Sequence, residues 1–333
     1  MIFQQKLFPL IEADELQAII SSPNLVILDI SSSKNISALQ PKNPGLQIAG
    51  ALQVDLKSHF SRKDTDLPNM APSPEVFVEQ LKLLGIDQNT NVVIYDNLGI
   101  YTSPRLWWLF RVMGYDMVRV LNGGLDAWLE AGGEVEKMSG GAPILKVGRI
   151  QTHNDNLDVS NEFEVLQAAD SPSENSAGRI DAFIRLPPHQ NDTSPIWTQS
   201  DVKSNLEKPN ATIVDARSPG RFEGTAPEPR AGWPSGHIPH SVNVPWKTLV
   251  DEGKYPPAPA CHPQVGREVL KNRISINIPP TGPLVFSCGS GLTACIVLLA
   301  AAIVWPEREL YLYDGSWVEW ANPELKGCPI ATG

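Results

Sequence analysis

The sequence predicts an α/β protein built from two similar domains, each a parallel sheet flanked by helices. Short apolar strands alternate with helical patterns along the chain, which is the order that parallel sheets require. The second half of the chain repeats the order of the first half, so the two halves are expected to share one fold. The length of 333 residues, with 42% apolar and 19% charged side chains, suits two hydrophobic cores of ordinary size.

The first half reads as apolar strands separated by helical patterns. Strands are expected at residues 25–29, 49–55, 91–96 and 117–121. Helices are expected at residues 8–20, 74–84 and 104–113 and again from residue 123, with Gly85 and Gly114 as stop signals. These elements form a complete unit, and the first domain is therefore expected to span residues 1–138.

The second half contains counterparts of the same elements. Residues 213–217, 238–244 and 284–288 correspond to residues 25–29, 48–54 and 92–96, and residues 314–320 align without gaps on residues 122–128. The two copies differ at one position of chemical interest, because Asp96 stands where the second copy has Cys288. The first half contains no cysteine, so cysteine chemistry is predicted only for the second domain, which is expected to span residues 196–333.

The stretch between the two halves is rich in Ser, Asp, Asn, Gly and Pro. Such a composition is typical of a linker, and residues 139–195 are expected to form a polar linker or insertion that is mobile in part. Trp197 is expected to mark the beginning of the second domain's fold.

Composition narrows the classes of function. The formal net charge of -10 disfavours nucleic acid or an anionic membrane as the main partner, although Arg217, Arg221 and Arg230 together suit a small anionic ligand. The cysteines form neither a disulfide framework nor a paired CxxC metal motif, which favours a reducing compartment; they stand at positions 261, 288, 295 and 328. The amino terminus lacks the features of a signal or transit peptide, and the longest apolar run, residues 294–305, is shorter than the ~20 residues that span a bilayer. A cytoplasmic location is expected, with a mitochondrial location as the alternative.

Residues 284–295 carry the strongest chemical signal in the chain. This stretch runs from an apolar strand through a glycine-bearing loop into an apolar helix, and Cys288 stands where the strand ends. The glycines allow a tight curl in which the backbone N–H groups of residues 289–293 can point at the sulfur, and the helix adds its positive end. Such a cup stabilises a thiolate, the nucleophilic form of cysteine. The alternative is a buried cysteine in an ordinary strand-to-helix turn, which the glycine spacing disfavours.

The run Cys-Gly-Ser-Gly-Leu-Thr-Ala-Cys at residues 288–295 closely resembles the active-site loop of the 3-mercaptopyruvate sulfurtransferases, members of the two-domain rhodanese family. Residues 214–239 and 313–320 resemble this family too. The resemblance implies tandem rhodanese-like domains in which Cys288 attacks the sulfur of 3-mercaptopyruvate, forms a persulfide and releases pyruvate. It further implies a thiol acceptor, such as thioredoxin or a small thiol, and no metal or organic cofactor.

Two arginines are candidates for binding the substrate. Arg221 and Arg230 lie in a segment broken by glycine and proline, so they are expected on a stiff loop rather than on one helical face. A guanidinium group held in this way can bind a carboxylate by forked hydrogen bonds. The alternative interpretation is that both arginines are solvated surface residues without a ligand. The resemblance implies that they hold the keto-acid end of the substrate. It implies substrate contacts for the loop as well, at Gly289, Gly291, Leu292 and Thr293.

Ser290 is a second catalytic candidate besides Cys288. A hydroxyl two residues after the nucleophile can donate to a developing negative charge or pass a proton to the departing enolate carbon. In the family this serine is linked to a histidine and an acid. This sequence has Gln47 at the place where that histidine is expected. Three alternatives follow: His59 takes the place of the histidine, water supplies the proton, or the enzyme has weakened activity.

Several other residues near these motifs are expected to have supporting roles. Structural roles are favoured for Arg217, His237, Trp317 and Trp320. Cys295 falls inside the apolar helix and is expected to be a packed core thiol, with redox pairing to Cys288 as the alternative. Tyr101 and Arg105 are expected on the wall that the first domain presents to the site.

Three other functions compete with this interpretation. A cysteine phosphatase needs an arginine six positions after the cysteine, and Ala294 in that place excludes it. A thiosulfate:cyanide sulfurtransferase is disfavoured because Gly289 and Ser290 supply no cation next to the nucleophile for a dianion. A sulfur carrier or interaction scaffold with weak activity remains as the non-enzymatic alternative.

Overall fold

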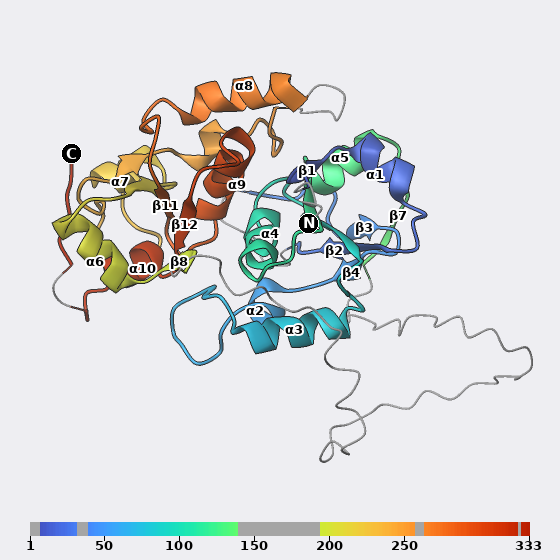
Figure 1. The fold of residues 1–333 in the computed structure, drawn as a ribbon, viewed down its shortest axis with the longest axis horizontal. Coiled ribbons are helices and arrows are strands. Elements are labelled where there is room, and N and C mark those ends of the chain that lie inside the picture. Colours follow the sequence, from blue (N-terminus) through green and yellow to red (C-terminus); the bar gives the residue numbers. More distant parts are fainter. Residues whose placement is uncertain (1–6, 32–38, 139–193, 257–262, 326–327) are drawn as a thin grey trace, which may run out of the picture.

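The computed structural model describes residues 7–31, 39–138, 194–256, 263–325 and 328–333. Two α/β halves lie side by side, with the first half in blue and green and the second in yellow to red (Figure 1). The two halves carry sheets of matching strand order, so the predicted α/β duplication is confirmed. The expected insertion at residues 139–195 lies almost wholly outside the described residues, and its bounds stay a prediction.

The first half is a five-stranded parallel sheet in the order β1-β6-β5-β2-β4. Its strands are β1 (Leu10–Ile11), β2 (Leu25–Asp29), β4 (Leu52–Gln53), β5 (Asn91–Tyr95) and β6 (Val118–Leu121). A separate antiparallel pair joins β3 (Leu46–Ile48) to β7 (Val135–Lys137). The helices are α1 (Ala13–Ile19), α2 (Leu56–His59), α3 (Pro74–Leu83), α4 (Ser103–Val112) and α5 (Gly124–Glu130).

The second half repeats this sheet in the equivalent order β8-β12-β11-β9-β10. Its strands are β8 (Ile196–Trp197), β9 (Thr212–Asp215), β10 (Val242–Asn243), β11 (Leu284–Ser287) and β12 (Leu310–Tyr313). Its helices are α6 (Gln199–Glu207), α7 (Pro219–Glu223), the 3-10 helix η2 (Trp246–Thr248), α8 (Pro263–Ile274), α9 (Ala294–Val304) and α10 (Ser316–Trp320). An isolated antiparallel bridge between His237 and Ala331 stands where the first half has its antiparallel pair.

Three expectations about local structure were wrong. The helix expected at residues 8–20 begins only at Ala13, because Leu10 and Ile11 pair with β6 as the strand β1. The strand expected at residues 49–55 is limited to β4, because the chain turns at Gly50, whose φ is +76°. Arg221 lies on a short helix, α7, and not on a loop, while Arg230 follows on the loop beyond it. The helix α7 begins with Pro219 in its first turn and ends at Gly224 in the left-handed conformation, two signals that suit a helix of five residues.

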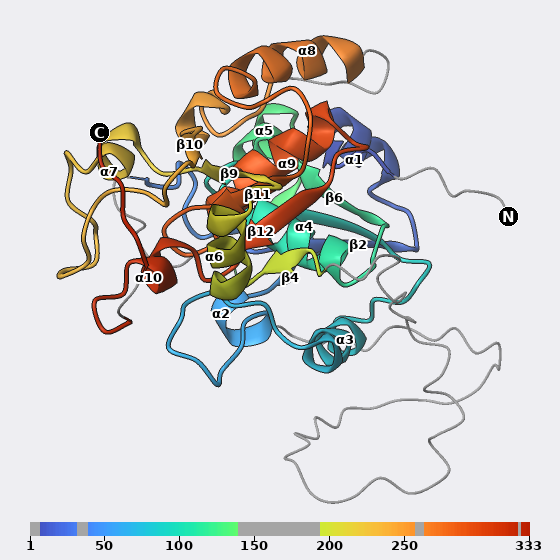
Figure 2. The same cartoon turned by 60° about the vertical axis from the view of Figure 1, so that its left-hand side comes forward.

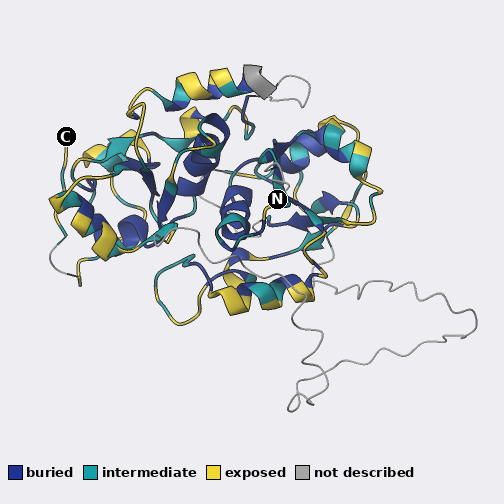
Figure 3. Ribbon diagram, viewed as in Figure 1, coloured by how far each residue is buried: buried dark blue, intermediate teal, exposed yellow. Residues whose placement is uncertain are grey.

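A shared hydrophobic core joins the two halves. It forms where α4 packs against α9, and Figures 1 and 2 show these helices side by side between the two sheets. Burial is nearly complete along both helices, which appear dark blue in Figure 3, whereas α3 and α8 each have one exposed face. The apolar run at residues 294–305 is therefore a core helix as predicted. Within the described ranges, no helix has the length and apolar character needed to cross a bilayer.

The two halves also exchange a pair of matching hydrogen bonds. The backbone N–H of Ala71, in the first half, donates to Oδ2 of Asp314 at 2.7 Å. The backbone N–H of Tyr255, in the second half, donates to Oδ1 of Asn122 at 2.9 Å. Asp314 and Asn122 occupy the same place in the two repeats, directly after the strands β12 and β6. In the first half the segment after α2 reaches the loop after β12 of the second half. In the second half the segment after η2 reaches the loop after β6 of the first half.

Candidate active site between the two domains

Cys288 lies at the carboxyl end of β11, in the middle of the second sheet. Its side chain is buried, with 1% of the residue exposed, and its carbonyl accepts a hydrogen bond from Trp317 N–H at 3.0 Å. Six residues, 288–293, then connect the strand to α9. Gly291 in this loop has a φ of +74°, and a Cβ on it would lie 2.9 Å from the backbone oxygen of Asp314. The loop thus needs glycine here for both conformation and space.

The corresponding loop of the first half shows what this geometry can bind. Asp96 occupies the position of Cys288, and its Oδ2 accepts hydrogen bonds from the backbone N–H groups of Tyr101, Thr102 and Ser103 at 3.1, 2.8 and 2.8 Å. The hydroxyl of Ser103 donates to the same oxygen at 2.8 Å. The strand-to-helix turn of this fold therefore concentrates N–H donors on a side chain at the strand end, as the sequence predicted for the cysteine loop.

Cys288 opens onto a pocket of about 410 Å³ formed by both halves. The first half contributes Pro68 and Tyr101. The second half contributes every predicted loop residue except Gly291, together with both predicted arginines: Arg221, Glu228, Pro229, Arg230, Trp233, Cys288, Gly289, Ser290, Leu292, Thr293, Trp317 and Val318. Gly291 lies behind the pocket, where its carbonyl faces Arg105.

Glu228 already occupies the hydrogen-bonding fork of Arg221. The Nε and Nη2 atoms of Arg221 donate to Oε1 and Oε2 of Glu228 at 3.0 and 2.5 Å. Glu228 is also paired with Arg217, whose Nη1 lies 2.9 Å from Oε1. Arg217 is fully buried and bonds Asp215 and the carbonyl of Gly236, so its expected structural role agrees with its contacts. Arg221 therefore keeps one nitrogen, Nη1, that is not engaged by Glu228.

Arg230 and Tyr101 complete the polar part of the pocket wall. Arg230 is exposed, and its guanidinium group stacks over Trp233 at 4.8 Å from the ring centroid. This stacking holds a flexible side chain at the rim of the pocket. Burial raises the pKa of Tyr101 to about 12, so its phenol stays protonated near neutral pH.

Ser290 is contacted from the first half by a residue that the sequence analysis missed. The amide nitrogen Nδ2 of Asn69 lies 3.1 Å from the backbone oxygen of Ser290 and 3.2 Å from its Oγ. The carbonyl of Asn69 accepts a hydrogen bond from Arg105, which is fully buried and pairs with Asp314 Oδ1 at 2.6 Å. No sequence pattern indicates Asn69, because the contact joins residues 221 positions apart.

Gln47, which stands where the relay histidine was expected, and His59, its possible substitute, both lie away from the pocket at Cys288. Gln47 is buried in the β3-β7 pair, where its Nε2 donates to Ala51 O at 3.1 Å and Glu136 Oε1 at 2.8 Å. His59 is bonded within its own turn, because its Nδ1 accepts from Asp55 N–H at 2.9 Å. Neither side chain lines the pocket at Cys288.

The remaining predicted residues have structural contacts. Cys295 is buried in α9, its thiol donates to Gly291 O at 3.3 Å, and burial raises its pKa to about 12, which disfavours the reactive thiolate. The ring of His237 stacks on Phe222 at 3.9 Å, and its Nδ1 lies 2.8 Å from the carbonyl of Phe222. Trp317 and Trp320 are each 1% exposed in the core of the second half.

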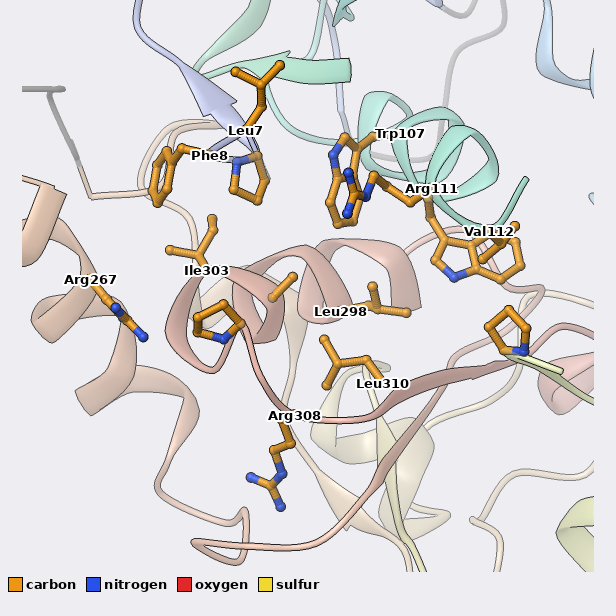
Figure 4. Close-up of a pocket in the computed structure, with 15 residues that line it drawn as sticks. Leu7, Phe8, Trp107, Arg111, Val112, Arg267, Leu298, Ile303, Arg308 and Leu310 are labelled. Carbon is orange, nitrogen blue, oxygen red and sulfur yellow. The ribbon is translucent and has the colours of Figure 1, made fainter. Parts of the chain in front are cut away.

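A second pocket of about 430 Å³ lies at the other ends of α4 and α9. Figure 4 shows its apolar floor, which includes Leu298 and Leu310, and three arginines at its rim. These arginines are already engaged by the protein. Arg111 pairs with Asp116, Arg267 donates to Val304 O, and Arg308 donates to two carbonyls of residues 281–282. This second pocket is the larger of the two but contains no cysteine, so the pocket at Cys288 remains the candidate active site.

The fold and this site define a tandem α/β protein with one cysteine loop between its domains. Residues 12–131 and 198–323 both match the family described as the rhodanese-like domain. The chain therefore belongs to the rhodanese family, and the resemblance stated from the sequence is confirmed.

Several relatives are similar over most of their length. The chain is 36% identical over 321 residues to the Arabidopsis thaliana protein named thiosulfate/3-mercaptopyruvate sulfurtransferase 1, mitochondrial. The matched region covers 95% of this chain and 77% of that relative. It is 33% identical over 282 residues to human 3-mercaptopyruvate sulfurtransferase, covering 83% and 78% of the two chains. The crystal structure of SseA from Escherichia coli, a 3-mercaptopyruvate sulfotransferase, superimposes with a TM-score of 0.64 at 27% identity over 93% of this chain and 99% of SseA.

Proposed function

We propose that the protein is a sulfurtransferase that moves sulfur from 3-mercaptopyruvate to a thiol acceptor through a persulfide on Cys288, with release of pyruvate. The observation that carries this proposal is the composition of one pocket, which brings a strand-end cysteine together with Arg221 and Arg230. A nucleophilic sulfur beside groups that bind a carboxylate suits a small keto acid that carries a thiol. The names of relatives at 33–36% identity support the same reaction.

The first step transfers the substrate sulfur to the enzyme. The Cys288 thiolate attacks the sulfur of mercaptopyruvate, an S–S bond forms, and the bond between that sulfur and C3 of the substrate breaks. The electron pair of the broken bond stays with C3 and is delocalised onto the neighbouring carbonyl oxygen as an enolate. C3 then takes a proton from solvent to give pyruvate, and the substrate thiol proton remains on the persulfide.

Arg230 and the free Nη1 of Arg221 are proposed to bind the carboxylate of the substrate, and the Ser290 hydroxyl is proposed to face its keto oxygen. The loop residues Gly289, Leu292 and Thr293 line the same pocket, and their backbone N–H groups are proposed to face the reacting sulfur. Such an arrangement favours the transition state, because the enolate carries more negative charge on its oxygen than the substrate does.

The second step returns the enzyme to its thiolate form. A thiolate of the acceptor attacks the outer sulfur of the persulfide and forms a new S–S bond with it. The S–S bond to Cys288 breaks, and its electron pair stays on Cys288 as the thiolate. The proposed acceptor is thioredoxin or a small thiol. A cytoplasmic location, with a mitochondrial one as the alternative, is part of the same proposal.

Thiosulfate is the second candidate donor, because the name of the Arabidopsis relative includes both thiosulfate and mercaptopyruvate. A weakly active sulfur carrier is the non-enzymatic alternative. Turnover separates these functions, since only an enzyme with the proposed donor releases pyruvate at a steady rate.

The test measures pyruvate release from mercaptopyruvate by the purified protein with a thiol acceptor. Without acceptor, the intact mass should rise by one sulfur atom. Cys288→Ser should abolish both signals, and the matched control Cys295→Ser should keep them because Cys295 is a buried core thiol. The opposite pattern for the two variants would refute the assignment of the nucleophile.

A further inference from the structure

The contact between Asn69 and Ser290 crosses the domain boundary at the catalytic loop. One nitrogen, Nδ2 of Asn69, lies within hydrogen-bond distance of both the backbone oxygen and Oγ of Ser290. A backbone carbonyl can only accept hydrogen bonds, so the group that faces it must be the amide NH₂ and not the amide oxygen. The two protons of this NH₂ group serve the two oxygens of Ser290. The hydroxyl oxygen of Ser290 is therefore the acceptor in its contact with Asn69.

Asn69 is held in place from behind. Its φ is +61°, in the left-handed region that asparagine tolerates better than most residues. Its backbone carbonyl accepts a hydrogen bond from Arg105, and the same guanidinium reaches the carbonyl of Gly291 at 3.4 Å. Arg105 is fully buried and ion-paired with Asp314, so the segment at Asn69 and the cysteine loop are fixed to one support.

We propose that Asn69 is a positioning residue that orients the Ser290 hydroxyl as a hydrogen-bond donor to the leaving enolate. This inference rests on the function proposed above. Because Oγ of Ser290 already accepts a hydrogen bond from Asn69, its own proton is directed to a partner in the pocket that Ser290 lines. The hydroxyl donates to the enolate oxygen while the bond between C3 and sulfur breaks. The proton stays on Ser290, so the residue needs no base behind it.

The amide does not ionise near neutral pH, so the orientation of Ser290 is independent of pH. Ionisable groups do surround the site: Tyr101, Arg221, Glu228, Arg230 and Cys288 face the pocket, and Arg105 and Asp314 lie behind the loop. A variant that places an ionisable group at position 69 should therefore add a pH dependence that the wild type lacks.

The experiment compares Asn69→Asp and Asn69→Gly with the wild type. Aspartate keeps the size and tolerates the positive φ, but an ionised carboxylate only accepts, so it turns the Ser290 proton away from the pocket. Its kcat for pyruvate release should fall about tenfold or more near neutral pH, with KM changed by less than about threefold. The ratio of variant to wild-type kcat should recover as pH falls through the pKa of the new carboxyl, because protonated aspartate can donate. Glycine removes the amide without backbone strain, and its loss in kcat should not recover at low pH.

Two controls distinguish positioning from a general structural effect. Asn277→Asp makes the same change at an exposed amide that donates to the carbonyl of Asn243, and it should leave kcat unchanged. In a Ser290→Ala background, Asn69→Asp should cause no further loss, because the group it orients is gone. Melting temperatures should show that all variants are folded.

The outcomes separate this inference from the function on which it rests. An active wild type whose Asn69 variants keep full kcat at every pH overturns the positioning role alone. A loss from Asn69→Asp that is equally large in the Ser290→Ala background also overturns it. A wild type that releases no pyruvate overturns the proposed function and this inference together.

Discussion

The two arginines of the pocket differ in what already binds them. Arg221 has its fork occupied by Glu228, and its side chain is 23% exposed. Arg230 is exposed and supported only by the face of Trp233 among its described contacts. Arg230 is therefore the freer of the two groups for a forked hydrogen bond with a substrate carboxylate.

Arg230→Lys is predicted to raise KM for mercaptopyruvate more than Arg221→Lys does. Lysine keeps the charge but loses the fork, and the loss of one charge-assisted hydrogen bond costs about 1.5–3 kcal/mol, or roughly ten- to a hundredfold in kcat/KM. Steady-state kinetics of both variants measure this. Arg273→Lys, on the exposed surface where Arg273 pairs with Asp251, is the control and should behave as the wild type. Unchanged KM in both pocket variants would show that neither arginine binds the substrate.

Single residues were predictable from sequence only where one short segment carries the signal. Cys288 and its loop could be identified because strand, glycines and helix are contiguous, and the structure lines the pocket with them. The pairing of Arg221 with Glu228 was missed although the residues are seven positions apart, since the turn between them decides whether they meet. Asn69 was out of reach, because its contact with Ser290 exists only once two domains have packed.

At the level of elements, the turn from β11 into α9 depends on the approach of Gly291 to another backbone. The added Cβ of an alanine would lie 2.9 Å from Asp314 O and 3.3 Å from Nη1 of Arg105. Asp314 and Arg105 form a buried ion pair, so neither atom can move away freely. The cysteine loop would have to shift instead.

Gly291→Ala is predicted to lower both the melting temperature and the rate of pyruvate release. The matched control is Gly85→Ala, since Gly85 has a φ of +68° but nothing within 4 Å of an added Cβ. The control should lose only about 1–2 kcal/mol of stability, which is the cost of placing alanine in the left-handed conformation. The loop variant should lose more stability, and its kcat should fall about a hundredfold, because a shift of about 1 Å misplaces the nucleophile. Equal losses in stability and activity for the two variants would contradict the close approach.

Helices and strands could be predicted from the sequence where several consecutive residues are buried, or where one face of the element is. The strands β2, β5 and β11 and the core helix α9 follow directly from apolar runs. The errors fell on short elements. The strand at residues 49–55 and the loop at Arg221 were misjudged because two strand residues, or one helical turn, contribute too little pattern to read.

At the level of the whole molecule, the charge of the interdomain pocket is expected to select the sulfur donor. The loop residues next to Cys288 carry no charge, and Glu228 offsets one of the two arginines on the wall. A thiosulfate dianion gains little attraction there to offset its desolvation, whereas a keto acid presents one carboxylate.

Mercaptopyruvate is predicted to exceed thiosulfate by at least about tenfold in kcat/KM, equivalent to about 1.4 kcal/mol. Glu228→Gln removes a negative charge from the pocket and should shift the ratio toward thiosulfate. Glu223→Gln is an exposed change at the end of α7, outside the pocket, and should leave the ratio unchanged. Equal rates with both donors in the wild type would show that pocket charge does not set the preference.

The matching bonds from Ala71 to Asp314 and from Tyr255 to Asn122 have the form of an isologous contact, in which each partner offers the same surface to the other. Such a contact is what two identical subunits make across a twofold axis, so the chain has the architecture of a homodimer joined into one polypeptide. The two copies need not be identical for such a contact to form, and at the strand end the first copy has Asp96 where the second has Cys288. Asn69 and Arg105 of the first copy nevertheless bond to the cysteine loop of the second, so the copy without the cysteine still supports that loop.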